Sequence, residues 1–520
     1  MTRVVMTANY NNLDHWTGRL FQADAGTVVT VRTATTFSFT LPAGHDYAGF
    51  KITAVGTGFT YLGGEPTSGN MTQLVVRNAA NQVVLVMDTF TNNGIANSLS
   101  QFASNAFGWQ LNGDGAGPDG GIAWSHLMSG NDVINGTAGN DRELQGVNAG
   151  NDIFNMYGGD DFVWGSIGND TIYGGDGYDT LSYNRTTWSE GASATRGIVA
   201  NMTTGKLIDS WGNIDTFTGI EHIEGSRFND VFVGSAVRNE FTGLRGADTI
   251  NGGGDQDRVN YDDDYWRGGR NGIVVDLETS VVSGHYYGTI RDGFGQTDRT
   301  IDIERVRGTR YNDVMVGSSD SNAFGGGEGR DYYNGMAGED SIRFGWRTGD
   351  TAQTGIVVNL SLATNQVAND GYGNVETALS IEGIVGSDQN DRITMTTGNN
   401  WLEGSDGRDT MTGGGGNDYF GWYDTGHIGD TDIITDFSAS GAATIDELGF
   451  NVASYTNMTT TLRLVNRATA TTAAGVGQFV FNAVNDTLYW DTNGSSAGGM
   501  ISVVTLIGVN ALSAANFDLY

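Results

Sequence analysis

A short pattern of alternating polar and apolar residues returns along this chain every nine residues. In Gly165–Tyr183, which reads GSIGNDTIYGGDGYDTLSY, Asp170 and Asp179 stand nine residues apart, and each lies two residues before an aliphatic side chain. Alternation over so few residues predicts a very short strand, since a helix would need a longer pattern. Glycine-rich turns precede both aspartates, so nine residues supply one strand and one turn.

The nine-residue step runs through four blocks, and we call its aspartate and asparagine positions slots. The first block has the slots Asp152, Asp161, Asp170 and Asp179 in unbroken register, with the slots Asp132 and Asp141 just upstream. The later blocks each read Asp-Asn-Asp-Asp, with the slots Asp230, Asn239, Asp248 and Asp257; Asp313, Asn322, Asp331 and Asp340; and Asp391, Asn400, Asp409 and Asp418. An apolar or aromatic residue follows two positions after the slots, as in Ile172, Leu181, Phe232, Ile250, Phe324, Ile342, Leu402 and Phe420.

The blocks themselves recur with a period of about 80 residues, which is typical of repeat architectures. A β-rich segment precedes each later block: GIVANM from Gly197, GIVVDL from Gly272 and GIVVNL from Gly355. An Ile-Glu pair follows each segment: Ile220-Glu221, Ile303-Glu304 and Ile381-Glu382. Such periodicity predicts an all-β solenoid whose successive turns bury their apolar residues against one another.

Two strands and two turns would complete a flattened coil of eighteen residues, and coils would stack about 4.8 Å apart by parallel β pairing. The pairs expected to stack along an edge are Asp161 and Asp179, Asp230 and Asp248, Asp313 and Asp331, and Asp391 and Asp409. Two carboxylates at this spacing repel by roughly 1 kcal/mol in water and about 3 kcal/mol at an effective dielectric constant near 20. Carboxylates and glycine-turn carbonyls suit Ca²⁺, which takes 6–8 oxygen ligands, better than Mg²⁺. The alternative is an ordinary β-helix whose turns hold no metal.

The motif GGxGxD followed by x-apolar-x resembles the calcium-binding repeat of RTX (repeats-in-toxin) proteins. Full matches are Gly174–Asp179, Gly326–Asp331 and Gly413–Asp418, and Gly404–Asp409 keeps part of the motif. The resemblance implies a parallel β-roll with several Ca²⁺ ions between turns. Its predicted ligands are turn carbonyls and Asp132, Asp141, Asp152, Asp161, Asp170, Asp179, Asp230, Asp248, Asp257, Asp313, Asp331, Asp340, Asp391, Asp409 and Asp418.

The neutral slots depart from the family pattern. Asn239, Asn322 and Asn400 would halve the number of carboxylates on the second edge of the later blocks. The hypothesis is that these blocks bind Ca²⁺ strongly on the first-and-third edge and weakly or not at all on the other.

Composition supports a folded, cation-binding protein. The chain has 60 acidic and 27 basic residues, a net charge of −33, 80 glycines, 3 prolines and no cysteine. This charge disfavours nucleic acid and anionic membranes as partners. The absence of cysteine excludes disulfides, and no apolar run approaches the ~20 residues of a membrane span. The N-terminus lacks the pattern of a secretory signal.

Six segments are predicted. Residues 1–126, with all three prolines, are expected to form a β-sandwich for anchoring or assembly. The segments 127–196, 197–271, 272–354 and 355–425 carry the four blocks as β-roll modules. Residues 426–520 resemble the tail of type I-secreted RTX proteins, with DIITDF from Asp432, GQFVFNAVNDTLYWDTNGSSAGG from Gly477 and the ending LSAANFDLY. The resemblance implies a C-terminal β cap with an uncleaved signal for the type I secretion machinery.

The sequence offers little for catalysis. None of the six histidines begins an H-E-x-x-H helix. The G-x-S-x-G match at Gly494–Gly498 is expected to be a hairpin loop of the tail, because it lacks a strand-elbow-helix context. The cluster Tyr261–Trp266 mixes acids with aromatics, as sugar clefts do, but an acidic solvated loop or extra cation site is the plainer interpretation.

We therefore expect a non-enzymatic, calcium-binding protein that is secreted and self-assembles as a homo-oligomer or lattice, in a surface layer or filament. In this design it resembles bacterial RTX surface-layer proteins. Two alternatives are an adhesin or biofilm-matrix protein that binds a cell-surface polysaccharide, and a secreted carbohydrate-active enzyme using Asp263 or Asp264.

Overall fold

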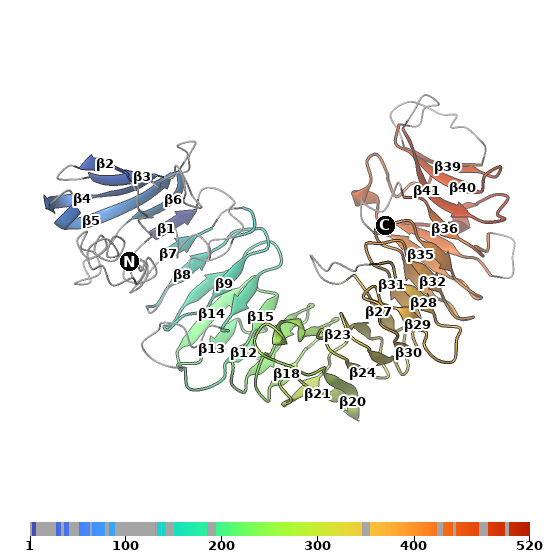
Figure 1. Cartoon of the computed structure of the whole chain (residues 1–520), viewed down its shortest axis with the longest axis horizontal. Coiled ribbons are helices and arrows are strands. Elements are labelled where there is room, and N and C mark those ends of the chain that lie inside the picture. Colours follow the sequence, from blue (N-terminus) through green and yellow to red (C-terminus); the bar gives the residue numbers. More distant parts are fainter. Residues whose placement is uncertain are drawn as a thin grey trace. The chain divides into compact units, whose positions relative to one another are not determined.

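The structure is a computed structural model. It describes residues 3–6, 28–32, 36–40, 51–62, 65–77, 83–88, 131, 133–136, 138–141, 150–184, 194–345, 354–423, 430–439, 444–466, 477–493 and 499–520. The chain divides into two compact units, Met1–Asp255 and Gln256–Tyr520. Both units are built from β-strands with only short helical turns, as Figure 1 shows. The all-β prediction is confirmed.

The N-terminal strands of the first unit form an antiparallel sheet in the order β2-β3-β4-β5-β6-β1. The strands are β1 (Arg3–Met6), β2 (Val28–Arg32), β3 (Thr36–Thr40), β4 (Lys51–Leu62), β5 (Glu65–Arg77) and β6 (Val83–Asp88). These described strands belong to one sheet, so the second layer of the predicted sandwich would lie outside the described residues. Strand β1 also pairs in parallel with β7 (Val133–Asn135), so this sheet continues into the first strand of the repeats.

The predicted coil of eighteen residues is present after β7. Strand β8 (Ile153–Asn155) pairs in parallel with β10 (Thr171–Tyr173), and β9 (Phe162–Trp164) pairs in parallel with β11 (Thr180–Ser182). The chain therefore alternates between two sheets, one strand to each. The middle residue of each strand points into the space between the sheets: Phe154, Val163, Ile172 and Leu181 are at most 1% exposed. This is the parallel β-roll expected from the sequence.

The segment before the second block extends only one of the two sheets. Strands β12 (Val199–Asn201), β13 (Lys206–Ile208) and β14 (Ile214–Thr218) form an antiparallel meander. The meander lies between β10 and the later coil strands β16 (Val231–Val233) and β18 (Thr249–Asn251). We call this sheet the inserted sheet. The other sheet, which we call the continuous sheet, runs in parallel from β9 and β11 to β15 (His222–Glu224) and β17 (Glu240–Thr242).

The second unit repeats this plan. Its inserted sheet has two runs, each with a meander: β22 (Thr297–Ile301), β21 (His285–Arg291), β20 (Val274–Val282), β24 (Val314–Val316), β26 (Tyr332–Asn334) and β30 (Thr377–Leu379); then β29 (Val367–Asn369), β28 (Val357–Asn359), β32 (Arg392–Thr394), β34 (Thr410–Thr412) and β36 (Asp432–Ile434). Its continuous sheet is parallel throughout: β19 (Arg258–Asn260), β23 (Arg305–Arg307), β25 (Ala323–Gly325), β27 (Ser341–Arg343), β31 (Gly383–Val385), β33 (Trp401–Glu403), β35 (Tyr419–Trp422), β37 (Glu447–Phe450) and β42 (Phe517–Leu519).

The C-terminal segment closes the second unit. Strand β41 (Met500–Leu506) pairs with β36, and β40 (Thr487–Asp491), β39 (Gln478–Asn482) and β38 (Leu464–Asn466) follow outward from it. The short 3₁₀ turns of this unit are η2 (Asp262–Asp264), η4 (Val452–Ser454) and η5 (Ala514–Asn516). Phe479 packs against both Phe450 and Phe517 at ring-centroid distances of 4.8 and 4.9 Å. This aromatic cluster fills the end of the roll.

Because the middle residues of the coil strands are buried, shortening one of them should leave a cavity and destabilise the fold. Phe324 of β25 is fully buried, so Phe324→Ala should lower the free energy of unfolding by about 3–5 kcal/mol. Urea unfolding in saturating Ca²⁺ would measure this. The control is Val314→Ala on the outer side of β24, where the side chain is 38% exposed and the expected loss is about 1 kcal/mol or less. Equal losses for the two variants would contradict the assignment of the core.

Candidate metal sites along the coil edges

The slots of successive coils are joined by hydrogen bonds. The backbone N–H of one slot donates to a carboxylate oxygen of the slot eighteen residues later, at 2.7 to 2.8 Å in the predicted pairs: Asp161 to Asp179, Asp230 to Asp248, Asp313 to Asp331, and Asp391 to Asp409. Asp141 and Asp152 donate in the same way to Asp161 and Asp170. Asp132 lies outside the described residues.

A second ladder explains why asparagine so often precedes the slot. The side-chain oxygen of Asn151 accepts the backbone N–H of Asn169, and those of Asn312 and Asn390 accept the N–H groups of Arg330 and Arg408. Each turn is therefore fixed to the next coil at two neighbouring positions, which holds the slots in register.

Carboxylates from outside the nine-residue step also occupy slot positions. Asp215 accepts the N–H of Asp170 at 2.8 Å, and Glu221 accepts the N–H of Asp179 at 3.0 Å. Glu304 and Glu382 accept in the same way from Asp257 and Asp340, and in the tail Asp432 and Asp446 accept from Asp409 and Asp418.

These extra carboxylates correct the expectation that asparagine halves the charge on the second edge. In the second unit the edge of the continuous sheet reads Asp257, Glu304, Asn322, Asp340, Glu382, Asn400, Asp418 and Asp446. The Glu of each Ile-Glu pair restores one carboxylate per module. Its sequence signal is the apolar residue two positions later, Ile223, Val306 or Ile384, which repeats the spacing of a true slot.

Seven slots lie in turns that satisfy their side chains with protein donors, and we call them closed slots. Each has a Ser or Thr four residues earlier. At Asp230, the Ser226 N–H donates to Oδ2 at 2.7 Å, and the Ser226 hydroxyl and Ile198 N–H donate to Oδ1 at 2.8 and 2.7 Å. These bonds take three of about four acceptor sites. The closed slots are Asp170, Asp230, Asn239, Asp313, Asn322, Asp391 and Asn400.

Eight other slots have a different turn, and we call them open slots. The residue four positions earlier has a positive φ, for example 120° at Gly175, 78° at Met336 and 70° at Ser405. The open slots are Asp161, Asp179, Asp248, Asp257, Asp331, Asp340, Asp409 and Asp418. All three asparagine slots are closed and all open slots are aspartates, so the negative charge is kept where the turn is open.

Several open slots present a buried oxygen that the protein leaves unused. Oδ2 is buried without a hydrogen-bond partner at Asp161, Asp179, Asp340 and Asp409. Such an atom costs free energy unless something binds it, because a buried charge needs compensation. The observation points to a cation.

Glycine lets the turn before a slot lie close to a backbone carbonyl of the preceding coil. A Cβ on Gly177, whose φ is 137°, would lie 2.1 Å from the Gly159 carbonyl oxygen, and one on Gly407 would lie 2.6 Å from that of Gln389. In the described part of the chain no three His, Cys, Asp or Glu side chains converge on a metal position. Carbonyls would therefore have to supply many of the ligands, which suits Ca²⁺ and its preference for oxygen.

Without a bound cation, burial disfavours the charged form of these carboxylates and raises their pKa values. It raises the pKa of Asp409 to about 9, with help from the nearby charges of Asp432 and Asp391. Burial likewise raises the pKa of Asp161 and Asp340 to about 7.

These raised pKa values predict the pH dependence of the calcium-free protein. A group with a higher pKa when folded stabilises the fold at low pH, and its contribution is lost as pH rises through the folded value. In chelator the far-ultraviolet signal of β structure should therefore be retained best near pH 6 and be lost toward pH 9. Saturating Ca²⁺ should remove this loss, since the ion binds the deprotonated form. A signal in chelator that grows from pH 6 to pH 9 would contradict the assignment.

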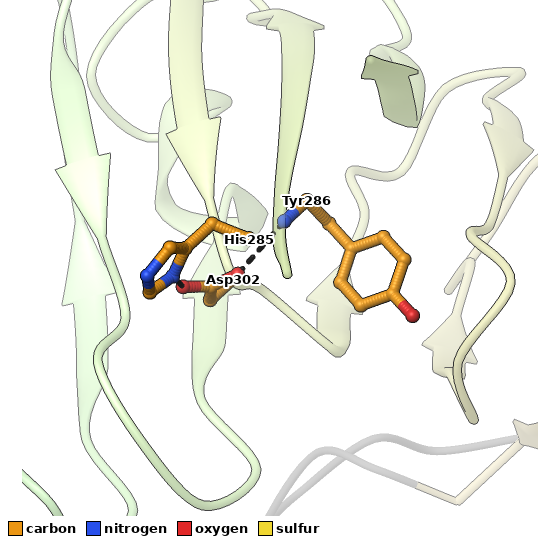
Figure 2. Close-up of polar contacts among 3 residues, drawn as sticks. All are labelled: His285, Tyr286 and Asp302. Atoms are coloured by element: carbon orange, nitrogen blue, oxygen red, sulfur yellow. Dashed lines mark hydrogen bonds and ion pairs between the residues drawn. The ribbon is translucent and has the colours of Figure 1, made fainter. Parts of the chain in front are cut away.

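The acidic cluster Tyr261–Trp266, which the sequence offered for catalysis, contains the 3₁₀ turn Asp262–Asp264. Asp264 is buried and accepts the Gly293 N–H at 2.9 Å, while Asp262 pairs with Arg307 at 3.3 Å. Figure 2 shows an ion pair that the sequence did not reveal: His285 Nδ1 lies 2.5 Å from Asp302 Oδ2, and Asp302 Oδ1 accepts the Tyr286 N–H at 2.9 Å. This pair joins two strands of an exposed meander. The Gly494–Gly498 match lies outside the described residues.

Comparison with protein families agrees with this geometry. The model of the RTX calcium-binding nonapeptide repeat, in four copies, matches residues 126–142, 147–181, 233–265, 301–343 and 385–420. No curated protein matches the chain. None of the described helices is long and apolar enough to cross a membrane.

Proposed function

Because the chain is an RTX calcium-binding repeat protein, we propose that it is a secreted structural protein that folds on Ca²⁺ outside the cell and assembles there into a surface layer or filament. The proposal rests on one observation above all, the buried Oδ2 atoms of open slots that no protein donor satisfies. These slots and the turn carbonyls would hold the ions. Bound Ca²⁺ would supply the positive charge that the stacked carboxylates lack.

Calcium also gives the protein a means to fold in the right place. Extracellular calcium modules bind in the range of about 10⁻⁴–10⁻³ M, so such sites stay empty in the cytosol and fill outside. The uncleaved C-terminal signal and the type I route belong to this proposal. Because the chain would stay unfolded while its Ca²⁺ sites are empty, it could be exported before it folds.

Assembly is supported by the outer side of the inserted sheet. Val199, Val274 and Val357 occupy the same position in the three meanders and are 41%, 38% and 37% exposed. A repeated apolar position on an open sheet face can pack against another copy. Ca²⁺ would reduce the repulsion between copies that a net charge of −33 imposes.

Light scattering and electron microscopy of the purified chain would test the proposal, with Ca²⁺ raised from chelator to several millimolar. Regular sheets or fibres that form with Ca²⁺ and dissolve with chelator would support it, with Mg²⁺ at equal ionic strength as control. A compact monomer at every Ca²⁺ level would overturn the assembly role and favour the adhesin.

A further inference from the structure

A trough lies on the outer face of the continuous sheet in the second unit. Its floor follows one side-chain position across consecutive strands, from Arg305 through Ala323, Ser341 and Gly383 to Trp401. The three central side chains are small, whereas both ends are large. The hollow has a volume of about 430 Å³, within the range of about 300–1,000 Å³ typical of ligand sites.

The aromatic end of the trough is held in place. Trp401 Nε1 donates to the Tyr423 hydroxyl at 2.9 Å. The indole ring lies over Gly383, where a Cβ would be 2.9 Å from Trp401 Cε3. A small residue at this position therefore lets the ring turn toward the trough. Tyr419 lines the trough beside it.

The polar lining offers both donors and acceptors. Arg305 and Arg343 supply guanidinium donors, and Glu339 and Glu382 supply carboxylate acceptors. Amides of Gln256, Asn399 and Asn417, which offer both functions, line the same hollow. Carboxylates at least balance the arginines here, and the chain as a whole carries −33, so a polyanion would be repelled.

We propose that this trough binds a segment of a neutral polysaccharide, with a sugar ring stacked on Trp401 and hydroxyl groups bonded to the arginine, carboxylate and amide side chains. Sugar hydroxyls both donate and accept, which matches the mixed lining better than an extended peptide, whose backbone would seek a free sheet edge. Strands bound the floor on both sides, so no edge is free there. The site goes beyond the proposed assembly role, and either can fail without the other.

Calorimetric titration of the full chain in saturating Ca²⁺ would test the site with four probes: cellohexaose, xylohexaose, mannohexaose and, as the acidic counterpart, hexagalacturonate. We expect at least one neutral probe to bind. Trp401→Ala should weaken that binding about tenfold. Ser341→Leu should weaken it similarly by filling the floor, with both aromatic residues unchanged. Val484→Ala, in the turn between β39 and β40 where the side chain is 89% exposed, is the control and should bind like the wild type.

Calcium-dependent melting of each variant would show that the fold is retained. Binding of no neutral probe, or neutral binding that survives both Trp401→Ala and Ser341→Leu, would overturn the proposal. Binding of hexagalacturonate alone would overturn the assignment of a neutral polysaccharide as the ligand. Loss of calcium-dependent assembly in both variants, with no neutral probe bound by the wild type, would instead assign the trough to a contact between copies.

Discussion

Removing Ca²⁺ from the folded protein should unfold the rolls and not merely loosen them. Four open slots, Asp161, Asp179, Asp340 and Asp409, keep a buried carboxylate oxygen without a protein partner. One ion at 100 times its dissociation constant stabilises the folded state by about 2.7 kcal/mol. A few such ions would match the whole stability of a typical domain, about 5–15 kcal/mol. We expect chelator at pH 8 to abolish most of the far-ultraviolet signal of β structure.

Circular dichroism and urea unfolding in Ca²⁺, in chelator and in Mg²⁺ would measure the effect. Mg²⁺ should restore little of the far-ultraviolet signal, because it demands a tighter octahedral site and retains its waters. If the signal returns when Ca²⁺ is added back, its loss in chelator was reversible unfolding and not irreversible aggregation. A roll with the same urea midpoint in chelator as in Ca²⁺ would refute a role for the ion in folding.

Substituting an open slot should have a different effect from substituting a closed one on the same edge. Asp409→Asn removes the charge of an oxygen without a protein partner, so the chain should bind one Ca²⁺ fewer. In chelator at pH 8 this variant should keep more of the far-ultraviolet signal of β structure than the wild type, because the pKa of Asp409 is about 9 and its burial penalises the charge.

Asp391→Asn is the matched closed-slot variant, eighteen residues earlier. The carboxylate of Asp391 accepts from the Ser387 N–H and hydroxyl at 2.6 and 2.8 Å and from the Ile356 N–H at 2.7 Å. An amide would lose part of this set, which should lower the free energy of unfolding in saturating Ca²⁺ by about 1–2 kcal/mol. Native mass spectrometry would count the ions in both variants. Loss of an ion from Asp391→Asn, or none from Asp409→Asn, would contradict the division into open and closed slots.

Much of this fold could be predicted from the sequence because its signals are local. The spacing of Asp170 and Asp179 with Ile172 and Leu181 fixes strand, turn and buried face within nine residues. The eighteen-residue coil follows from that spacing, and the structure has it.

Other features depend on contacts between residues on either side of an insertion, and these residues have no fixed spacing in the sequence by which they could be predicted. Asp215 reaches the N–H of Asp170 from forty-five residues away, and Glu221 reaches Asp179 from forty-two. The trough floor likewise depends on which strands become neighbours, since Gly383 and Ser341 are separated by a segment of other structure. The difference between open and closed slots was only partly readable from the sequence: a Ser or Thr stands four residues before every closed slot, but Ser405 stands four residues before the open slot Asp409 as well.

The hydrogen bonds between slots all run in one direction. The N–H of a slot donates to a carboxylate that comes later in the chain: Asp313 to Asp331, Asp391 to Asp409, and Asp409 to Asp432. A coil therefore relies on its successor for the acceptor that fixes its turn, and the last acceptors, Asp432 and Asp446, belong to the tail. The C-terminal segment thus supplies the closing acceptors of both edges of the second unit. A chain cut short before Asp432 should leave the N–H groups of Asp409 and Asp418 without these acceptors, so truncation of the tail should destabilise the last coils first.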